Sequence, residues 1–204
     1  MNSNYEKRAL INTANMQWKE NSKNVLKKLL SLKDNEETSL IKLNENSILN
    51  QNSKINSVEI FVLEGTYINQ YGEFSEGTYL KLSEENESLV KTDTTCVIFR
   101  KTNHFTNEQK IIVNTKTSQW LKGQGNLEVM PLDVQTALVK WPKDEKFIPH
   151  KHFGGEEIFV LTGIFMDEHG QYPKGSWIRS PHLSAHFPYV EEETIIFVKT
   201  GHLS

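Results

Sequence analysis

The residues best suited to chemistry lie together in the segment 150–156, HKHFGGE. His150 and His152 are two residues apart, so on a strand both imidazoles project to the same face, as two ligands of one metal must. The two glycines that follow allow a sharp turn, because glycine tolerates backbone angles that other residues avoid. Glu156 then opens the next predicted strand at a parity that can return its carboxylate to the same interior. This segment therefore predicts a metal site.

A fourth candidate ligand is His186, which follows the turn-rich segment 175–185, GSWIRSPHLSA. Three imidazoles and one carboxylate suit a divalent metal such as Fe, Mn, Ni or Zn, and leave coordination positions open for water, oxygen or a substrate. The alternative is that these are ordinary polar residues on exposed strands. Spacing, ligand chemistry and flanking glycines together favour the metal site.

The elements that must position these residues occur twice in the chain. The segment EIFVLEG at 59–65 recurs as EIFVLTG at 157–163, an offset of 157 − 59 = 98, and this offset aligns residues 52–104 without a gap. Further upstream, Asn12-Thr13 matches Asn114-Thr115 at an offset of 102, so the first copy carries extra residues near LKDNEE. The repeat predicts two homologous domains, residues 1–105 and 106–204.

Each half has the pattern of β-strands. The segments 136–141, 157–162 and 194–199 are rich in branched and aromatic residues. The leucines of 24–33, NVLKKLLSLK, have a helical spacing, but the counterpart NLEVMPLD alternates and contains Pro131, which favours an edge strand, so we predict a strand in both places. Because the strand at 157–162 is apolar on both faces, we expect its outer face to be covered, either by the other half or in a homodimer.

Two sequence motifs resemble those of a known family. H-x-H-x3-E-x6-G, filled by His150, His152, Glu156 and Gly163, resembles the first cupin motif, and G-x5-P-x4-H, filled by Gly175, Pro181 and His186, resembles the second. The longer segment that contains both motifs, residues 150–188, resembles the cupin family named after the anti-sigma factor ChrR. The resemblance implies an all-β fold of two tandem cupin double-stranded β-helix (jelly-roll) barrels, with one divalent metal ion (Zn, Fe, Mn or Ni) in the C-terminal barrel.

Some positions depart from the family pattern. Asp144 and Leu183 replace glycines of the two motifs, which we expect to affect loop shape more than metal binding. In the first half, the 98-residue offset maps the four ligands to residues that cannot replace them: Asn52, Lys54, Val58 and Ser88. The first barrel is therefore predicted to bind no metal in this way, and to cover apolar surface, fix assembly or shape the pocket mouth.

Other polar and aromatic residues have a structural alternative. A pocket could be lined by Tyr172, Trp177, Arg179 and Tyr189, with Arg179 as an anchor for a carboxylate. The first-half counterparts Phe74, Tyr79 and Lys81 keep size or charge without a metal, which favours a structural role. His182 could hydrogen-bond a ligand, but a solvent-facing turn position is favoured. Structural roles are also predicted for His169, His202 with its twin His104, and Cys96, a buried inert thiol.

Composition excludes several classes of protein. The 204 residues are 24% charged and 37% hydrophobic, with a mean hydropathy of −0.53, as in a soluble globular chain. A net charge of −3 lacks the basic excess of nucleic-acid-binding proteins. The single cysteine excludes an internal disulfide framework and Cys-rich metal sites. Neither a signal peptide nor the ~20 apolar residues of a membrane span is found, so we expect a cytoplasmic protein.

These observations leave three functions open. The first is a metal-dependent, dioxygenase-like enzyme acting on a small carbonyl or phenolic molecule, with no catalytic residue assigned beyond the ligands. The second is a regulatory cupin of the ChrR type that acts on a sigma factor in trans, since the single cysteine excludes the zinc module such proteins usually carry. The third is a non-catalytic cupin that binds a small molecule.

Overall fold

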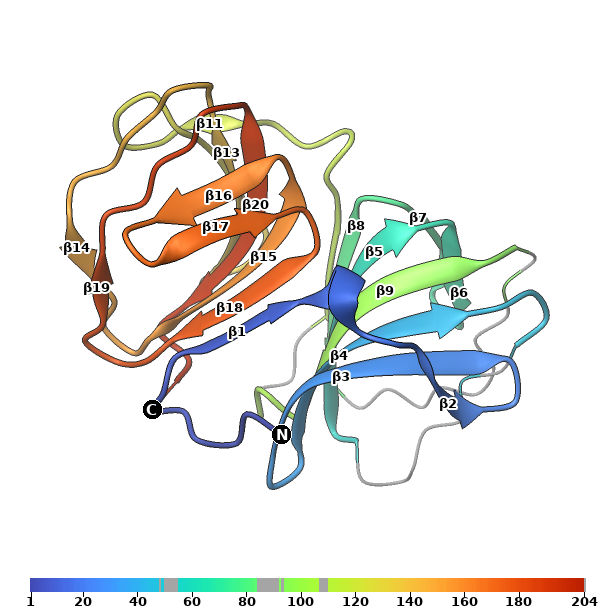
Figure 1. Cartoon of the computed structure of the whole chain (residues 1–204). Coiled ribbons are helices and arrows are strands. Elements are labelled where there is room, and N and C mark those ends of the chain that lie inside the picture. The colour runs from blue at the N-terminus through green and yellow to red at the C-terminus, as the bar shows by residue number, and fades with distance from the viewer. Residues whose placement is uncertain (48, 50–54, 84–91, 93, 107–109, 204) are drawn as a thin grey trace. The chain divides into compact units, whose positions relative to one another are not determined.

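The structure is a computed structural model of the chain, and it describes all residues except 48, 50–54, 84–91, 93, 107–109 and 204 (Figure 1). Almost all regular structure is β, as predicted, and the helical part of the described chain is the short 3-10 helix η1 (Thr13–Asn15). Among the described residues no helix is long and apolar enough to cross a membrane.

The chain forms two compact units. The first consists of residues 1–3 and 17–118 and contains a seven-stranded antiparallel sheet and a two-stranded hairpin. The sheet has the order β10 (Lys110–Asn114), β8 (Thr78–Ser83), β5 (Ser57–Glu64), β9 (Cys96–Thr102), β4 (Glu36–Leu43), β3 (Val25–Lys33) and β2 (Lys19–Ser22). The hairpin pairs β6 (Thr66–Asn69) with β7 (Gly72–Ser75).

The second unit consists of residues 4–16 and 119–204 and repeats this design. Its sheet has the order β1 (Ala9–Asn12), β18 (Ser176–Ser180), β15 (Glu156–Thr162), β20 (Thr194–Thr200), β13 (Thr136–Trp141), β12 (Glu128–Pro131) and β11 (Leu121–Lys122). One hairpin pairs β16 (Ile164–Asp167) with β17 (Gly170–Pro173), and another pair joins β14 (His150–Lys151) and β19 (Ala185–His186). The positions equivalent to β14 and β19 in the first half lie outside the described residues.

The segment with helical leucine spacing is strand β3, as predicted. Its pairing with β4 shifts register between Leu29 and Ser31, which marks a β-bulge. Because a bulge changes the face to which the following residues point, the apolar pattern does not alternate along the strand. In the counterpart β12, Pro131 pairs only with β13, since β11 reaches only Glu128 and Val129; the proline lies at a local edge of the sheet.

The leading strands of the two halves are exchanged between the units. β1 pairs with β18, with Ala9 opposite Arg179, and β10 pairs in the equivalent register with β8. The backbone N–H and the hydroxyl of Thr13 both donate to the carbonyl of Gly175, at 3.2 and 2.7 Å. The domain boundary predicted at residue 105 concerns the sequence repeat and stays a prediction. The two compact units have other bounds, because the first strand of each half pairs in the sheet of the other unit.

The glycine that ends the first motif is required by the backbone of both barrels. β15 and β5 each shift register near their ends, and Gly163 and Gly65 follow with φ of +72° and +75°. A Cβ atom on Gly163 would lie 2.4 Å from Thr194 Oγ1, and one on Gly65 would lie 2.2 Å from the carbonyl oxygen of Thr95. Since the first half shares this requirement, this glycine belongs to the fold and not to the metal site.

Strand exchange predicts where a threonine substitution acts. Thr13→Val removes the hydroxyl bond to Gly175 and should cost about 1 kcal/mol, because one intramolecular hydrogen bond is lost. Hydrogen exchange followed by mass spectrometry should become faster in residues 170–180. The matched control, Thr115→Val, removes the equivalent 2.6 Å bond to Gly77 and should loosen residues 72–82 instead. Faster hydrogen exchange at residues 72–82 in Thr13→Val would contradict the proposed effect of the strand pairing between β1 and β18.

Candidate metal centre

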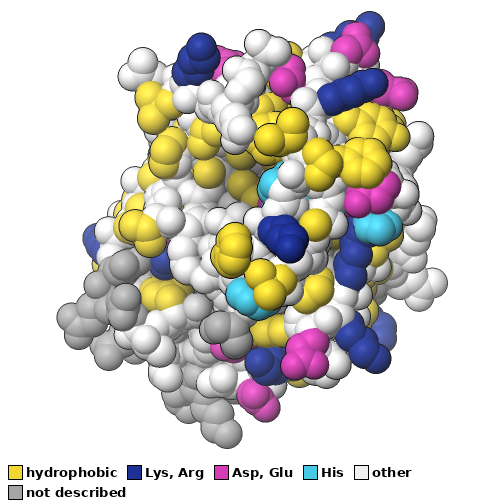
Figure 2. All heavy atoms as spheres, turned by 90° about the vertical axis from the view of Figure 1, so that its left-hand side faces the viewer, with side chains coloured by type: hydrophobic (Ala, Val, Ile, Leu, Met, Phe, Trp, Pro, Cys, Tyr) yellow, Lys and Arg dark blue, Asp and Glu magenta, His cyan; other side chains and the backbone are white. Residues whose placement is uncertain are grey.

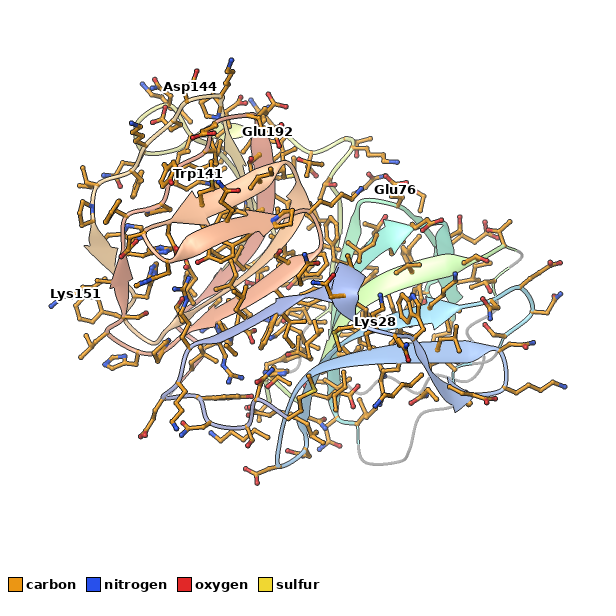
Figure 3. All side chains as sticks on the ribbon, viewed as in Figure 1. Lys28, Glu76, Trp141, Asp144, Lys151 and Glu192 are labelled. Atoms are coloured by element: carbon orange, nitrogen blue, oxygen red, sulfur yellow. The ribbon has the colours of Figure 1, made fainter. Side chains whose placement is uncertain are left out.

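His150 and His186 are placed by a short pair of strands. β14 and β19 pair in a register that sets these two histidines directly opposite each other, with ring centroids 5.0 Å apart. Between the two histidines of the HKH segment, Lys151 is exposed and points away from the barrel (Figure 3). The alternation predicted for this segment therefore holds, and His150 and His152 have ring centroids 4.6 Å apart.

His152 is held by its backbone. Its N–H donates to the carbonyl of Ser184 at 3.0 Å, and its carbonyl accepts the N–H groups of Leu183 at 2.9 Å and Gly155 at 3.2 Å. Both turn segments that flank the site thus meet at this one residue, which fixes the direction in which the imidazole enters the barrel.

Two glycines return the chain from His152 to Glu156, the first residue of β15. Gly154 and Gly155 have φ of +75° and +73°, and a Cβ atom on Gly154 would lie 2.6 Å from Gly201 Cα. The N–H of Gly154 donates to Nδ1 of His182 at 2.8 Å. His182 is exposed and stabilises this turn, in agreement with its predicted position in a turn.

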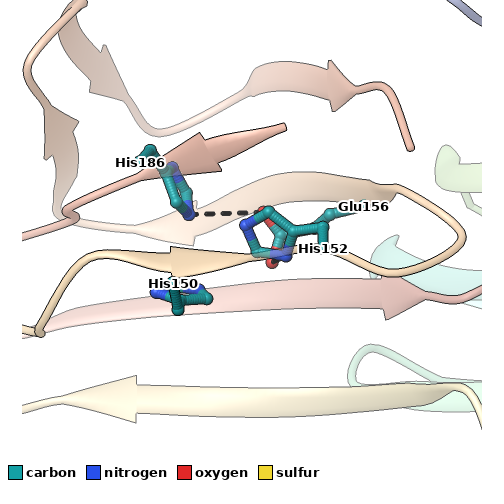
Figure 4. A group of neighbouring side chains, drawn as sticks. All are labelled: His150, His152, Glu156 and His186. Carbon is teal, nitrogen blue, oxygen red and sulfur yellow. Dashed lines mark ion pairs between the residues drawn. The ribbon is translucent and has the colours of Figure 1, made fainter. Parts of the chain in front are cut away.

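The four predicted ligands come together inside the second barrel (Figure 4). One ligand atom from each of His150, His152, Glu156 and His186 lies within 4.8 Å of all the others. Nδ1 of His152 is 3.5 Å from Glu156 Oε1, and Nε2 of His186 is 3.7 Å from Glu156 Oε2. Three of the residues are buried, whereas His150 is partly exposed, so the cluster is open on the side of His150.

The donor set fits a bound metal ion. His152 Nε2 and Glu156 Oε2 are buried and have no hydrogen-bond partner among the described residues. A buried acceptor left unpaired costs about 1–3 kcal/mol, and a divalent cation would satisfy both atoms. Nδ1 of His150 donates to the carbonyl of Ile148 at 3.1 Å, which leaves its Nε2 lone pair available as a ligand. These residues would hold a first-row metal with three nitrogens and one oxygen.

Burial sets the protonation of the cluster. It lowers the pKa of His152 to about 3, helped by the rings of His186 and His150, and it also lowers the pKa of His150. Burial raises the pKa of Glu156 to about 7, against the opposing effect of His186. His150 and His152 are therefore in the neutral form that binds a metal, whereas Glu156 must release a proton.

A cavity of about 560 Å³ lies beside the cluster and was not predicted from the sequence. It is lined by Lys146, Phe147, Pro149, Phe187, Pro188 and Tyr189. The ring of Phe147 packs edge-on against His150, with centroids 5.1 Å apart. Figure 2 shows hydrophobic side chains gathered on the side of Figure 1 where β14 and β19 lie, with histidine side chains among them. Pro149 precedes His150 and Phe187 follows His186 in the sequence, and this proximity to the predicted ligands could have identified both as cavity residues.

The four residues proposed from sequence to line a pocket divide into two groups. Tyr189 lines the cavity, and Tyr172 is buried next to Asp167, to which its hydroxyl donates at 2.6 Å. Trp177 and Arg179 flank Ile178, a member of the barrel core, so alternation along β18 points them to the opposite face. Arg179 is buried there and donates to the carbonyl of Asn4 at 3.1 Å, which supports its structural interpretation.

The remaining histidines and the cysteine lie outside the cluster. Nε2 of His202 is 3.0 Å from Glu157 Oε2, and Nε2 of His104 is 3.2 Å from the carbonyl oxygen of Glu37. His169 is an exposed turn residue next to Asp167. The thiol of Cys96 is buried, and burial raises its pKa to about 12, as expected of an inert thiol.

The two departures from the glycine pattern keep the backbone that glycine would adopt. Asp144 and Leu183 have φ of +64° and +62°. This region costs a residue with a Cβ atom about 1–2 kcal/mol. The loops therefore keep left-handed positions at the expense of local strain, and the N–H of Leu183 still reaches His152.

In the first barrel, the position of Glu156 is taken by Val58, which is fully buried in an apolar cluster with Ile60, Leu80 and Leu82. Valine has no ligand atom, so this position offers nothing to a metal. The other three equivalent positions, Asn52, Lys54 and Ser88, lie outside the described residues.

The fold and the cluster define a cupin, a small jelly-roll barrel whose interior presents histidines and a carboxylate. The sequence profile of the ChrR cupin-like domain matches residues 6–106 and again 108–204, and the chain belongs to this family. Both the predicted family and the predicted jelly-roll barrels are thereby confirmed. No curated protein matches the sequence significantly.

Solved structures share this fold at low sequence identity. A candidate dioxygenase from Nostoc punctiforme is 15% identical with a TM-score of 0.77, covering 95% of this chain and 82% of that one. The protein YlbA from E. coli is 15% identical with a TM-score of 0.70, covering 97% and 92%. A deletion mutant of Bacillus subtilis oxalate decarboxylase is 9% identical with a TM-score of 0.62, covering 95% and 77%.

Substitution of the ligands tests the site directly. His152→Ala and Glu156→Ala should each lower bound metal from about one ion per chain to a small fraction, because a four-residue set loses a buried ligand. Elemental analysis of the purified proteins measures this. His169→Ala is the control and should keep its metal, since its side chain is exposed in a turn. Undiminished metal in both ligand variants would refute the site.

Metal binding should depend on pH through Glu156. Its pKa of about 7 means that one proton leaves as the ion binds, so below pH 7 the apparent dissociation constant should fall about tenfold per pH unit as the pH rises. Competition with a chromophoric chelator between pH 5.5 and 8 gives the slope. Glu156→Gln has no such proton and should show a shallower slope; an equal slope in both proteins would contradict the assignment.

Proposed function

We propose that the second barrel holds one divalent metal ion and that the protein is a dioxygenase-like or related metal-dependent enzyme acting on a small molecule. The observation that carries the proposal is that two buried donor-set atoms, His152 Nε2 and Glu156 Oε2, have no hydrogen-bond partner among the described residues and lie beside an open apolar cavity. A purely structural barrel has no need of either feature, and the first half folds with Val58 in place of the carboxylate.

The residues around the cavity have separate tasks. When bound, the metal supplies Lewis acidity and, for iron or manganese, redox chemistry. Phe147, Phe187 and Pro188 form apolar walls that exclude water and hold the body of a small substrate. Lys146 lines the same cavity, and its positive charge favours a substrate that carries a negative charge or a polarised oxygen. The partly exposed His150 marks the side on which substrate approaches the cluster.

These properties favour a small carbonyl or phenolic substrate. Such a molecule has an oxygen for the metal and a compact body for apolar walls, and it fits a cavity of about 560 Å³. Two proteins of the same fold are described as a candidate dioxygenase and an oxalate decarboxylase. The substrate named in the second description, oxalate, is a small dicarboxylate. The likeness in fold supports this direction without choosing the substrate.

A second function is supported by the family match itself, since the family takes its name from ChrR. In this alternative the metal site senses a small molecule or a redox change, and the barrel regulates a sigma factor in trans in the cytoplasm. A non-catalytic binding protein would use the same cavity without turnover. A homodimer is compatible with each of these functions.

Turnover distinguishes these functions. Metal-free protein reloaded with Fe(II), Mn(II), Ni(II) or Zn(II) would be assayed for oxygen uptake and product formation with small carbonyl and phenolic compounds. We expect turnover with at least one metal, and its loss in Glu156→Gln. Phe187→Ala should raise KM roughly tenfold or more, because a buried aromatic contact with substrate is worth about 1.5–3 kcal/mol.

A substitution on the surface of the first unit serves as the control. Lys116→Ala, on an exposed side chain of the first unit, should leave KM unchanged. Absence of turnover with every metal, together with recovery of a sigma factor in a pull-down, would replace the enzyme by the regulatory alternative.

A further inference from the structure

A buried carboxylate lies behind the ligand His186. Nδ1 of His186 donates to Asp167 Oδ2 at 3.4 Å, and the Asp167 side chain is fully buried. Nη2 of Arg8 donates to the same oxygen at 2.7 Å and to the hydroxyl of Tyr172 at 2.7 Å. That hydroxyl in turn donates to Asp167 Oδ1 at 2.6 Å. Arg8 belongs to the exchanged N-terminal segment, so a residue at the start of the chain reaches the surroundings of a ligand 178 positions later.

Hydrogen-bond donors surround both oxygens of Asp167. Oδ2 accepts from Arg8, and Oδ1 accepts from the Tyr172 hydroxyl and, at 2.8 Å, from the backbone N–H of His169. Because Asp167 Oδ2 already accepts the guanidinium of Arg8, it is an acceptor towards His186 as well, and the contact at 3.4 Å places a proton on Nδ1. Nε2 then presents its lone pair on the side of Glu156, 3.7 Å away.

The first barrel provides an internal comparison. Through the two offsets of the repeat, Asn69 stands for Asp167, Phe74 for Tyr172 and Lys110 for Arg8. Asn69 Oδ1 accepts the N–H of Tyr71 at 2.8 Å, just as Asp167 Oδ1 accepts the N–H of His169 at 2.8 Å. The turn thus needs a single acceptor oxygen, which both residues supply.

The second oxygen of Asp167, Oδ2, has a different use. In the first half the corresponding atom is the amide nitrogen of Asn69, which has no hydrogen-bond partner among the described residues. Phe74 also lacks the hydroxyl of Tyr172. Lys110 lies over the ring of Tyr71, with its Nζ 3.9 Å from the centroid. The charged oxygen, the phenol and the guanidinium therefore occur together only in the barrel that carries ligands, although the fold forms without them.

From this difference we infer that Arg8, Asp167 and Tyr172 are positioning residues for His186: they fix its tautomer and orientation, and thereby strengthen metal binding. The inference rests on the proposed metal site. It assigns a role to the N-terminal segment, because Arg8 supplies the cation that keeps Asp167 in place. It also explains why Tyr172 keeps a hydroxyl where the first half has phenylalanine.

Asp167→Asn is the sharpest test, because the first barrel already uses asparagine at this position. The variant should keep the turn, yet bind Zn(II) or Co(II) roughly 10- to 100-fold more weakly, the usual effect of losing a carboxylate behind a histidine ligand. Competition with a chromophoric chelator measures the affinity, and the visible spectrum of the Co(II) protein should change with the ligand geometry.

Two further variants keep the test informative if Asp167→Asn folds poorly. Tyr172→Phe and Arg8→Ala leave the carboxylate in place and should weaken metal binding by a smaller factor, and Arg8→Lys should recover part of the loss. Lys110→Ala changes the equivalent residue of the first barrel and should leave metal affinity unchanged. An equal loss in Lys110→Ala and Arg8→Ala would overturn the inference.

A second measurement needs no metal. The ¹⁵N shifts of the His186 ring in metal-free protein should report a proton on Nδ1 in the wild type and a shift towards Nε2 protonation in Asp167→Asn. Unchanged tautomer and affinity in Asp167→Asn would overturn the inference while leaving the metal site intact. A wild-type protein that binds no metal would instead refute the proposed function.

Discussion

The candidate metal centre of the second barrel is organised around one buried carboxylate. Glu156 begins a central strand whose other inward residues, Ile158 and Val160, are apolar, and its Oε2 has no hydrogen bond among the described residues. A carboxylate in such surroundings is stable only when it is protonated or when a positive charge lies beside it. His150 and His152, whose pKa values are lowered by burial, supply ligand atoms without supplying that charge. The chemistry of the site therefore suits a cation.

Much of the surrounding architecture serves this carboxylate and its neighbours. The pairing of β14 with β19 sets two imidazoles opposite each other, and consecutive glycines with positive φ bring Glu156 back beneath them. Behind His186, the Asp167 carboxylate is itself compensated by Arg8 and Tyr172. The buried Asp167 carboxylate thus has partners on two other segments of the chain, which tie its turn to the barrel.

The two halves separate what the fold requires from what the site requires. Both keep the glycine after the bulge, at positions 65 and 163, and both keep a threonine that closes the exchanged strand onto a glycine carbonyl. Among the described residues, the second half has Glu156 where the first has Val58, and it has Asp167 behind His186 where the first has Asn69. Residues shared by the halves therefore stabilise the barrel, and residues that differ point to chemistry.

The sequence is sufficient for the repeat, for the strands and for the grouping of His150, His152, Glu156 and His186, because each depends on local spacing or on an offset that can be counted. It did not reveal the role of Arg8, since a contact between residues 8 and 167 leaves no trace in either periodicity or motif. The cavity was missed for a similar reason: Phe147 and Tyr189 meet only after folding. Leu183 was recognised as a departure, but its positive φ is a property of the folded loop.

The exchange of leading strands has a consequence for how such a chain could arise. A single barrel with the strand pairing seen here would lack one edge strand of its sheet, because its own first strand pairs in another barrel. It would have to receive the strand from a second copy, as strand-swapped dimers do. Duplication with fusion places both copies in one molecule, so that the reciprocal donation becomes intramolecular and independent of concentration. In this chain the half that has Val58 where the other has Glu156 still lends its first strand to the barrel that holds the histidine cluster.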